Sequence, residues 1–152
     1  MSIGAYFAFF RGEVYDYPYV EAISSAAAMC EAVVVLTDPR FKDGTLKRLR
    51  ELEDSLENLT VYEEEVALHS TSPLGSWKNA ARKKLDQDWL LEMEPYWIIH
   101  DSGVGEACKD AAPNVYCIGL SGVAFFNGNN VKHSAPKILG IISRNVDTLT
   151  HG

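Results

Sequence analysis

The stretch from residue 32 to residue 45, AVVVLTDPRFKDGT, constrains the fold of this chain more than any other. Residues 33–37 are all apolar or β-branched and show no helical spacing, which is the pattern of a strand buried on both faces. Asp38 and Asp43 follow in a loop, and residues 46–56 then place leucines at helical spacing with charges on the other face. This order of strand, acidic loop and helix is typical of α/β proteins, in which ligands bind at the carboxyl ends of the strands.

Two interpretations of the acidic loop remain open on these residues alone. In the local interpretation, Asp38 starts a turn and Asp43 caps the following helix through the amides of its first turn. In the functional interpretation, both carboxylates face a ligand at the strand end. Asp is favoured at both positions for purely local reasons, so the pattern by itself favours the local interpretation.

The rest of the chain continues the alternation of strands and helices. Residues 3–10 predict a first buried strand and residues 19–29 an Ala-rich helix, which together with residues 33–37 complete a βαβ unit. We therefore expect one α/β domain with a mostly parallel central sheet flanked by helices and a more antiparallel C-terminal part. The remaining predicted elements are strands at 59–66, 88–93, 114–120, 123–126 and 137–142, helices at 46–56, 77–85 and 103–111, and a hairpin turn at 127–130.

Composition narrows the class of protein. The net charge of -7 argues against a general nucleic-acid binder. The three cysteines show no metal-binding spacing, which predicts buried thiols in a reducing, cytoplasmic compartment. The N-terminal residues are typical of a first strand rather than a signal peptide. No apolar run approaches the ~20 residues of a membrane span.

Four segments, in order, resemble the family 2 glycosyltransferases, which are nucleotide-sugar transferases with a GT-A fold. Asp38, Asp43 and Thr45 match the family's Asp-x-x-Ser-x-Asp-x-Thr motif at the right spacing, and Asp88-Trp89 matches its Asp-Trp strand. The four segments are AYFAFFRGE, VVVLTDPRFKDGT, KNAARKKLDQDWLLEMEPYW and SRNVDTLTHG.

The resemblance implies a single GT-A-like domain over residues 1–152, with a nucleotide-binding half at about 1–101. Such a domain binds a nucleoside-diphosphate sugar and transfers the sugar to an acceptor, which the sequence does not identify. In this interpretation Asp38 and Asp43 accept hydrogen bonds from the base and ribose. Arg11 and Lys78 would face the diphosphate.

The resemblance also implies a divalent cation, Mg²⁺ or Mn²⁺, which neutralises the leaving diphosphate. The family's Asp-x-Asp-Glu motif falls on Glu94, Tyr96 and Trp97 in this register. Glu94 keeps a carboxylate, whereas a phenol at Tyr96 is neutral at physiological pH and does not replace one. His151, in the last segment, is the other expected ligand, and we expect Glu92 to point to the opposite face of its strand.

The departures from the family pattern keep two further hypotheses open. Changes at Gly12, Phe41, Tyr96 and Trp97 favour a catalytically degenerate GT-A domain that serves as a binding or assembly module. An unrelated α/β nucleotide-binding fold is the other alternative. The chain has no GxGxxG motif and no Walker-type glycine loop, which disfavours that alternative.

Overall fold

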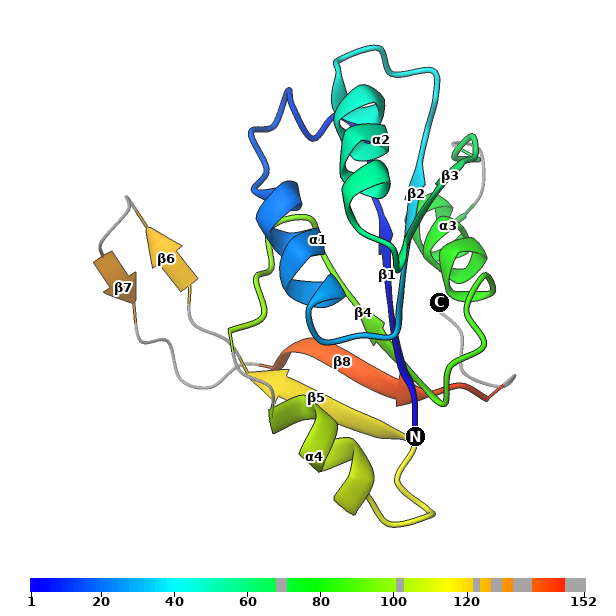
Figure 1. Cartoon of the computed structure of the whole chain (residues 1–152), viewed down its shortest axis with the longest axis vertical. Helices are drawn as coiled ribbons and strands as arrows, with labels where there is room; N and C mark the ends of the chain where they lie inside the picture. Colours follow the sequence, from blue (N-terminus) through cyan, green and yellow to red (C-terminus); the bar gives the residue numbers. More distant parts are fainter. Residues whose placement is uncertain (68–70, 101–102, 122–123, 127–129, 133–137, 147–152) are drawn as a thin grey trace.

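The computed structural model of the chain describes residues 1–67, 71–100, 103–121, 124–126, 130–132 and 138–146 (Figure 1). Within these ranges no helix combines the length and the apolar character that crossing a bilayer would require. The described elements are β1 (Ile3–Ala8), α1 (Tyr19–Ala27), β2 (Ala32–Thr37), α2 (Thr45–Ser55), β3 (Leu59–Glu63), α3 (Pro73–Arg82), β4 (Trp89–Glu92), α4 (Gly103–Asp110), β5 (Cys117–Ser121), β6 (Ala124–Phe126), β7 (Asn130–Lys132) and β8 (Ile138–Arg144).

Six of the described strands form one sheet in the order β3-β2-β1-β4-β8-β5. The pairs β3-β2, β2-β1 and β1-β4 are parallel. A helix precedes each of β2, β3 and β4 in the chain, as the crossover between parallel strands requires. β8 pairs antiparallel with both β4 and β5, so the C-terminal part of the sheet is the antiparallel part. The predicted fold class is therefore confirmed.

Helices cover both faces of the sheet, and successive side chains of β1 point alternately to one face and the other. Ile3, Ala5 and Phe7 pack into a core with residues of α1, α2 and α4, whereas Tyr6 and Ala8 pack with residues of α3. Figure 1 shows α1 and α2 in front of the sheet and α3 behind it. Strands buried on both faces explain why residues 33–37 carry no polar break.

Element boundaries differ from the predictions by a few residues. α3 begins at Pro73 rather than at residue 77, because proline suits the first turn of a helix, where its missing N–H has no partner to lose. β3 ends at Glu63, so the acidic run that follows lies outside the strand. β6 and β7 pair antiparallel, as a hairpin requires, and residues 127–129 of the predicted turn lie outside the described residues.

The outer edge of β3 is covered by side chains of α2. The Val61 amide donates a hydrogen bond to Glu53 Oε1 at 2.7 Å, and the Val61 carbonyl accepts one from Arg50 Nη1 at 2.9 Å. Arg50 also pairs with Glu53 at 2.6 Å and with Glu63 at 2.7 Å. The open backbone groups of Val61, which point away from β2, are therefore satisfied within the chain.

Candidate functional site at the carboxyl edge

The loops that follow β1, β2 and β4 meet at one edge of the sheet because these strands are parallel neighbours. The chain moves from β1 to β2 on one side and later returns to β4 on the other side of β1. This arrangement is a topological switch point, where ligands of open α/β sheets bind. We call residues 9–17, 38–44 and 92–97, with Trp77 and Lys78 of α3, the carboxyl edge.

Asp38 begins the turn that follows β2. The Phe41 amide donates to the Asp38 carbonyl at 3.3 Å, which closes a four-residue turn with Pro39 at its second position. The Arg40 amide donates to Asp38 Oδ1 at 3.0 Å. The local role expected for Asp38 is therefore present.

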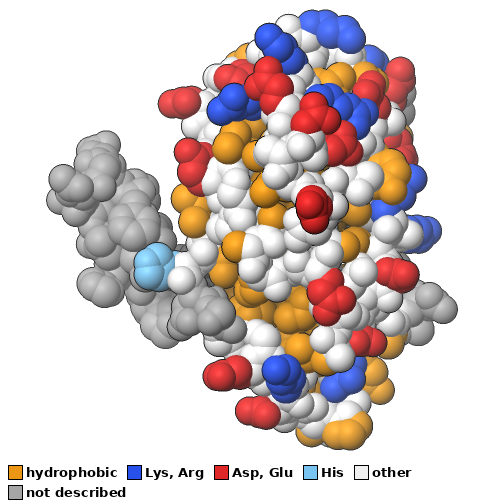
Figure 2. Space-filling view, in the orientation of Figure 1, with side chains coloured by type: hydrophobic (Ala, Val, Ile, Leu, Met, Phe, Trp, Pro, Cys, Tyr) orange, Lys and Arg blue, Asp and Glu red, His pale blue; other side chains and the backbone are white. Residues whose placement is uncertain are grey.

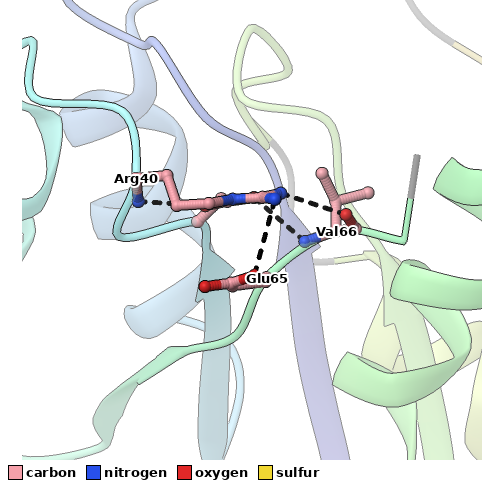
Figure 3. A network of polar contacts seen from close by, with 4 residues as sticks. Arg40, Glu65 and Val66 are labelled. Carbon is pink, nitrogen blue, oxygen red and sulfur yellow. Dashed lines mark hydrogen bonds and ion pairs between the residues drawn. The ribbon is translucent and has the colours of Figure 1, made fainter.

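The buried carboxylate of Asp38 also forms an ion pair with Arg40, and both of its oxygens take part. Asp38 is 1% exposed, and Arg40 approaches it with Nε at 2.9 Å from Oδ1 and Nη2 at 2.5 Å from Oδ2. The Val66 amide donates to Oδ2 at 2.9 Å, and Arg40 reaches the Val66 carbonyl at 3.1 Å and Glu65 at 3.5 Å (Figure 3). The Arg40 hydrogen bonds lower the pKa of Asp38 to about 2. These contacts fill the acceptor positions that a nucleotide base would use.

Asp43 joins the loops after β1 and β2. Its Oδ1 accepts from the Thr45 amide at 3.2 Å, its Oδ2 accepts from Thr45 Oγ1 at 2.7 Å, and the Val14 amide lies 3.4 Å from Oδ2. The Glu13 amide donates to Thr45 Oγ1 at 3.2 Å. Burial acts to raise the pKa of Asp43, but the hydrogen bonds from Thr45 outweigh it and the pKa is lowered. Asp43 thus accepts from the first residue of α2, while the N-cap position itself is Gly44, which has a φ of 96° and no side-chain cap.

Arg11 lies over an aromatic stack formed by Phe10, Phe41 and Trp77. Its guanidinium carbon is 4.6 Å from the centroid of the Phe41 ring, and Phe41 stacks on Phe10 at 4.4 Å. Phe10 lies 5.9 Å from Trp77 of α3. Arg11 has a φ of 55°, a conformation that residues other than glycine seldom adopt. Phe41, which stands where the family usually has Ser, is therefore a packing residue of the carboxyl edge.

Lys78 of α3 lies between two carboxylates at the end of β4. Its Nζ is 2.6 Å from Glu92 Oε1 and also contacts Glu94 Oε1. Burial acts to lower the pKa of Lys78, but Glu92 and Glu94 outweigh it and the pKa is raised. The expectation that Glu92 points away from Glu94 is wrong, because residues two apart along an extended chain share a face.

The other positions of the predicted metal motif carry no carboxylate. The Trp97 amide donates to the Glu94 carbonyl at 3.1 Å, so Glu94 opens a turn. Tyr96 is 51% exposed and packs against Tyr17 at 5.6 Å. Burial and the neighbouring Glu94 raise the pKa of Tyr96, so its phenol stays protonated.

Among the described residues, no group of three or more His, Cys, Asp or Glu side chains is placed to hold a metal ion. His151, the second predicted ligand, lies outside the described residues. The described groups do not fit a divalent cation: the two carboxylates of Glu92 and Glu94 already hold the Lys78 ammonium, and the phenol of Tyr96 is neutral.

The structure places Arg11, Asp38 and Asp43 in the loops that follow β1 and β2, Lys78 in α3 and Glu94 after β4, and it brings Lys78 and Glu94 into contact. The sequence reasoning missed Arg40 and Glu92. A signal for Arg40 exists in the Asp-Pro-Arg tripeptide, since an Asp that starts a turn bonds the backbone two residues on and so places the third residue beside its carboxylate. The signal for Glu92 is its spacing of two residues from Glu94.

No protein-family model matches this sequence. No curated protein matches it either. Solved structures do match, and the chain is similar to S. aureus TarS 1-349 in complex with UDP-GlcNAc, at 24% identity and a TM-score of 0.55 over 72% of this chain and 30% of that chain. It is also similar to the mannosyltransferase PcManGT from Pyrobaculum calidifontis in complex with GDP-Man and Mn²⁺, at 16% identity and a TM-score of 0.53 over 78% and 34%.

A third neighbour is 4-diphosphocytidyl-2C-methyl-D-erythritol synthase from Anaerococcus prevotii, at 8% identity and a TM-score of 0.61 over 95% of this chain and 70% of that chain. The chain spans about a third of the length of the two glycosyltransferases. At these identities the likeness shows the fold. The chain has a GT-A-like fold, which it shares with these neighbours.

Proposed function

We propose that this chain binds a nucleoside-diphosphate sugar at the carboxyl edge and acts as the nucleotide-binding part of a glycosyltransferase. The observation that carries the proposal is the combination at one switch point of Arg11, the aromatic stack and Lys78. The solved structures of two neighbours contain UDP-GlcNAc and GDP-Man, which are ligands of this class.

The chemistry of such a ligand matches what the carboxyl edge offers. A base and ribose provide an aromatic face and hydroxyl donors, and a diphosphate requires positive charge. The stacked rings of Phe10 and Phe41 support Arg11, whose guanidinium can bind phosphate oxygens in pairs. In the transfer step the bond between sugar and phosphate breaks and negative charge builds on the departing diphosphate, so cations beside it lower the barrier.

The two acidic residues of the loop take supporting roles in this proposal. Asp38 holds Arg40 in place, and Asp43 joins the two loops that carry Arg11 and Phe41. Arg40, whose side chain is 42% exposed, is the polar group that the Asp38 turn presents toward solvent. A base is therefore expected to meet Arg40 rather than the Asp38 carboxylate.

A second candidate function is a binding or assembly module that keeps the nucleotide pocket but not the transfer chemistry. This function is favoured by the carboxylate of Asp38, which is already hydrogen-bonded within the chain, and by the phenol of Tyr96, which stands where the family motif has a carboxylate. Both functions require nucleotide binding, and only the first requires turnover. Release of free UDP or GDP from the sugar nucleotide, followed by chromatography, separates them.

Calorimetric titration of the chain with UDP-GlcNAc and GDP-mannose tests the proposal. We expect saturable binding, weakened about 10-fold or more by Arg11→Ala, because one charge-assisted hydrogen bond contributes ~1.5–3 kcal/mol. The matched control is Lys109→Ala, since Lys109 is an exposed cation of α4 at the other end of the sheet. Absence of binding with both nucleotides and their diphosphates would contradict the proposal.

A further inference from the structure

The carboxyl edge already contains a cation where the resemblance implies a metal ion. The side chains of Lys78, Glu92 and Glu94 are only 17%, 20% and 22% exposed. Two of the three ammonium hydrogens of Lys78 point to carboxylate oxygens within the described part of the chain, which leaves a third for another acceptor. Glu92 and Glu94 come from the end of β4, and Lys78 reaches them from α3.

A divalent ion and the Lys78 ammonium exclude one another at these carboxylates. Mg²⁺ and Mn²⁺ bind carboxylate oxygens at about 2.1 Å, and Lys78 Nζ lies 2.6 Å from the same Glu92 oxygen. Two cations held that close together repel strongly in a partly buried site.

We propose that the Lys78 ammonium is the resident cation of the carboxyl edge and takes the place of a divalent metal ion, so that a nucleoside diphosphate binds there without Mg²⁺ or Mn²⁺. The statement about the nucleotide rests on the proposed function, whereas the exclusion of metal from Glu92 and Glu94 does not.

The positive charge that could meet a diphosphate is local to Lys78 and Arg11, since the carboxyl edge as a whole has more carboxylates than cations. Lys78, Glu92 and Glu94 together carry one net negative charge, because two carboxylates face one ammonium. Arg11 adds a positive charge at the same edge. The third ammonium hydrogen of Lys78 and the guanidinium of Arg11 are thus the donors for phosphate oxygens, and Glu92 and Glu94 hold Lys78 in position.

The test compares Mn²⁺ binding, measured by electron paramagnetic resonance of free Mn²⁺, in the wild type and in Lys78→Gln. We expect the variant to bind Mn²⁺ about tenfold or more tightly than the wild type, because removal of a like charge about 4 Å away is worth at least that factor. The added change Glu94→Gln should abolish the gain, and Lys109→Gln is the control for loss of a lysine elsewhere. Equal affinity of wild type and Lys78→Gln for Mn²⁺ overturns the proposal.

A second measurement needs no variant of Lys78. Thermal unfolding of the wild type should be unchanged by millimolar MnCl₂, and a stabilisation by MnCl₂ that Glu94→Gln removes overturns the proposal. Titration with UDP and GDP in EDTA and in MnCl₂ should give equal affinities. If neither diphosphate binds in either buffer, the proposed function fails while the Mn²⁺ comparison still decides the role of Lys78.

Discussion

Replacement of Asp38 by Asn tests whether the ion pair with Arg40 and Val66 holds the carboxyl edge together. Asn keeps the shape of the side chain but turns one acceptor oxygen into a donor, which then faces the donors of Arg40 or Val66. The Val66 amide is buried, and loss of its acceptor costs ~1–3 kcal/mol. Arg40 is partly exposed, so water can replace much of the hydrogen bonding that its guanidinium loses. We expect the free energy of unfolding to fall by about 2–3 kcal/mol at pH 7.

The same pair predicts how stability depends on pH. The pKa of Asp38 is about 2 in the folded chain, against ~3.9 in an unfolded chain. A depressed pKa stabilises the fold above the unfolded value, and this contribution is lost as the pH falls from about 4 toward 2. The shift corresponds to at most about 2.6 kcal/mol, and to about half of that once screening at the exposed Arg40 is included. About half of the contribution should be gone by pH 3.

Urea unfolding of wild type and Asp38→Asn at pH 7, 5 and 3, followed by tryptophan fluorescence, measures both effects. Trp77 and Trp89 are buried and report on the core. Asp54→Asn is the matched control, because Asp54 is an exposed carboxylate of α2 and its change should stay within ~0.5 kcal/mol. An Asp38→Asn variant as stable as this control at pH 7, or a difference that does not shrink by pH 3, would refute the reasoning.

Two further predictions concern packing and thiol access. Gly12→Ala should lower the free energy of unfolding in urea by ~1–3 kcal/mol, because a Cβ at Gly12 would lie 2.8 Å from the Tyr19 ring. Gly105→Ala should be neutral or stabilising, because no atom lies within 4 Å of a Cβ there. Equal effects at both positions would contradict the packing argument. In the native chain an aromatic disulfide reagent should react with the exposed Cys117 well before the buried Cys30, because burial raises the pKa of the Cys30 thiol to about 12. Mass spectrometry of the labelled peptides measures the order of reaction.

Much of the fold follows from local patterns in the sequence. The unbroken apolar residues 33–37 and the leucines of residues 46–56 predict β2 and α2, because burial on both faces and burial on one face leave different spacings. The order of strands in the sheet does not follow from any single segment. The return of the chain to β4 on the far side of β1 depends on which helices cover which face.

The sequence predicts a site at the carboxyl ends of the parallel strands, but it does not reveal how the side chains there pair with one another. The carboxyl ends of parallel strands converge by geometry, so the loops of Arg11, Asp38 and Glu94 were expected at one edge. The contact of Lys78 with Glu94 joins a helix to a strand end across the fold, and spacing along the chain does not reveal it. Placement of Asp38 as a free acceptor failed to account for Arg40, which satisfies it from two residues away.

The side chains of Arg50 and Glu53 along β3 also bear on how copies of this chain behave at high concentration. A strand at the end of a sheet can recruit an identical strand from another molecule through its unpaired amides and carbonyls. At Val61 those groups are already bonded within the molecule, and a recruiting strand would first have to displace a charged pair. Growth of the sheet into fibrils or paired molecules through β3 is therefore disfavoured, and loss of Arg50 together with Glu53 would open that route.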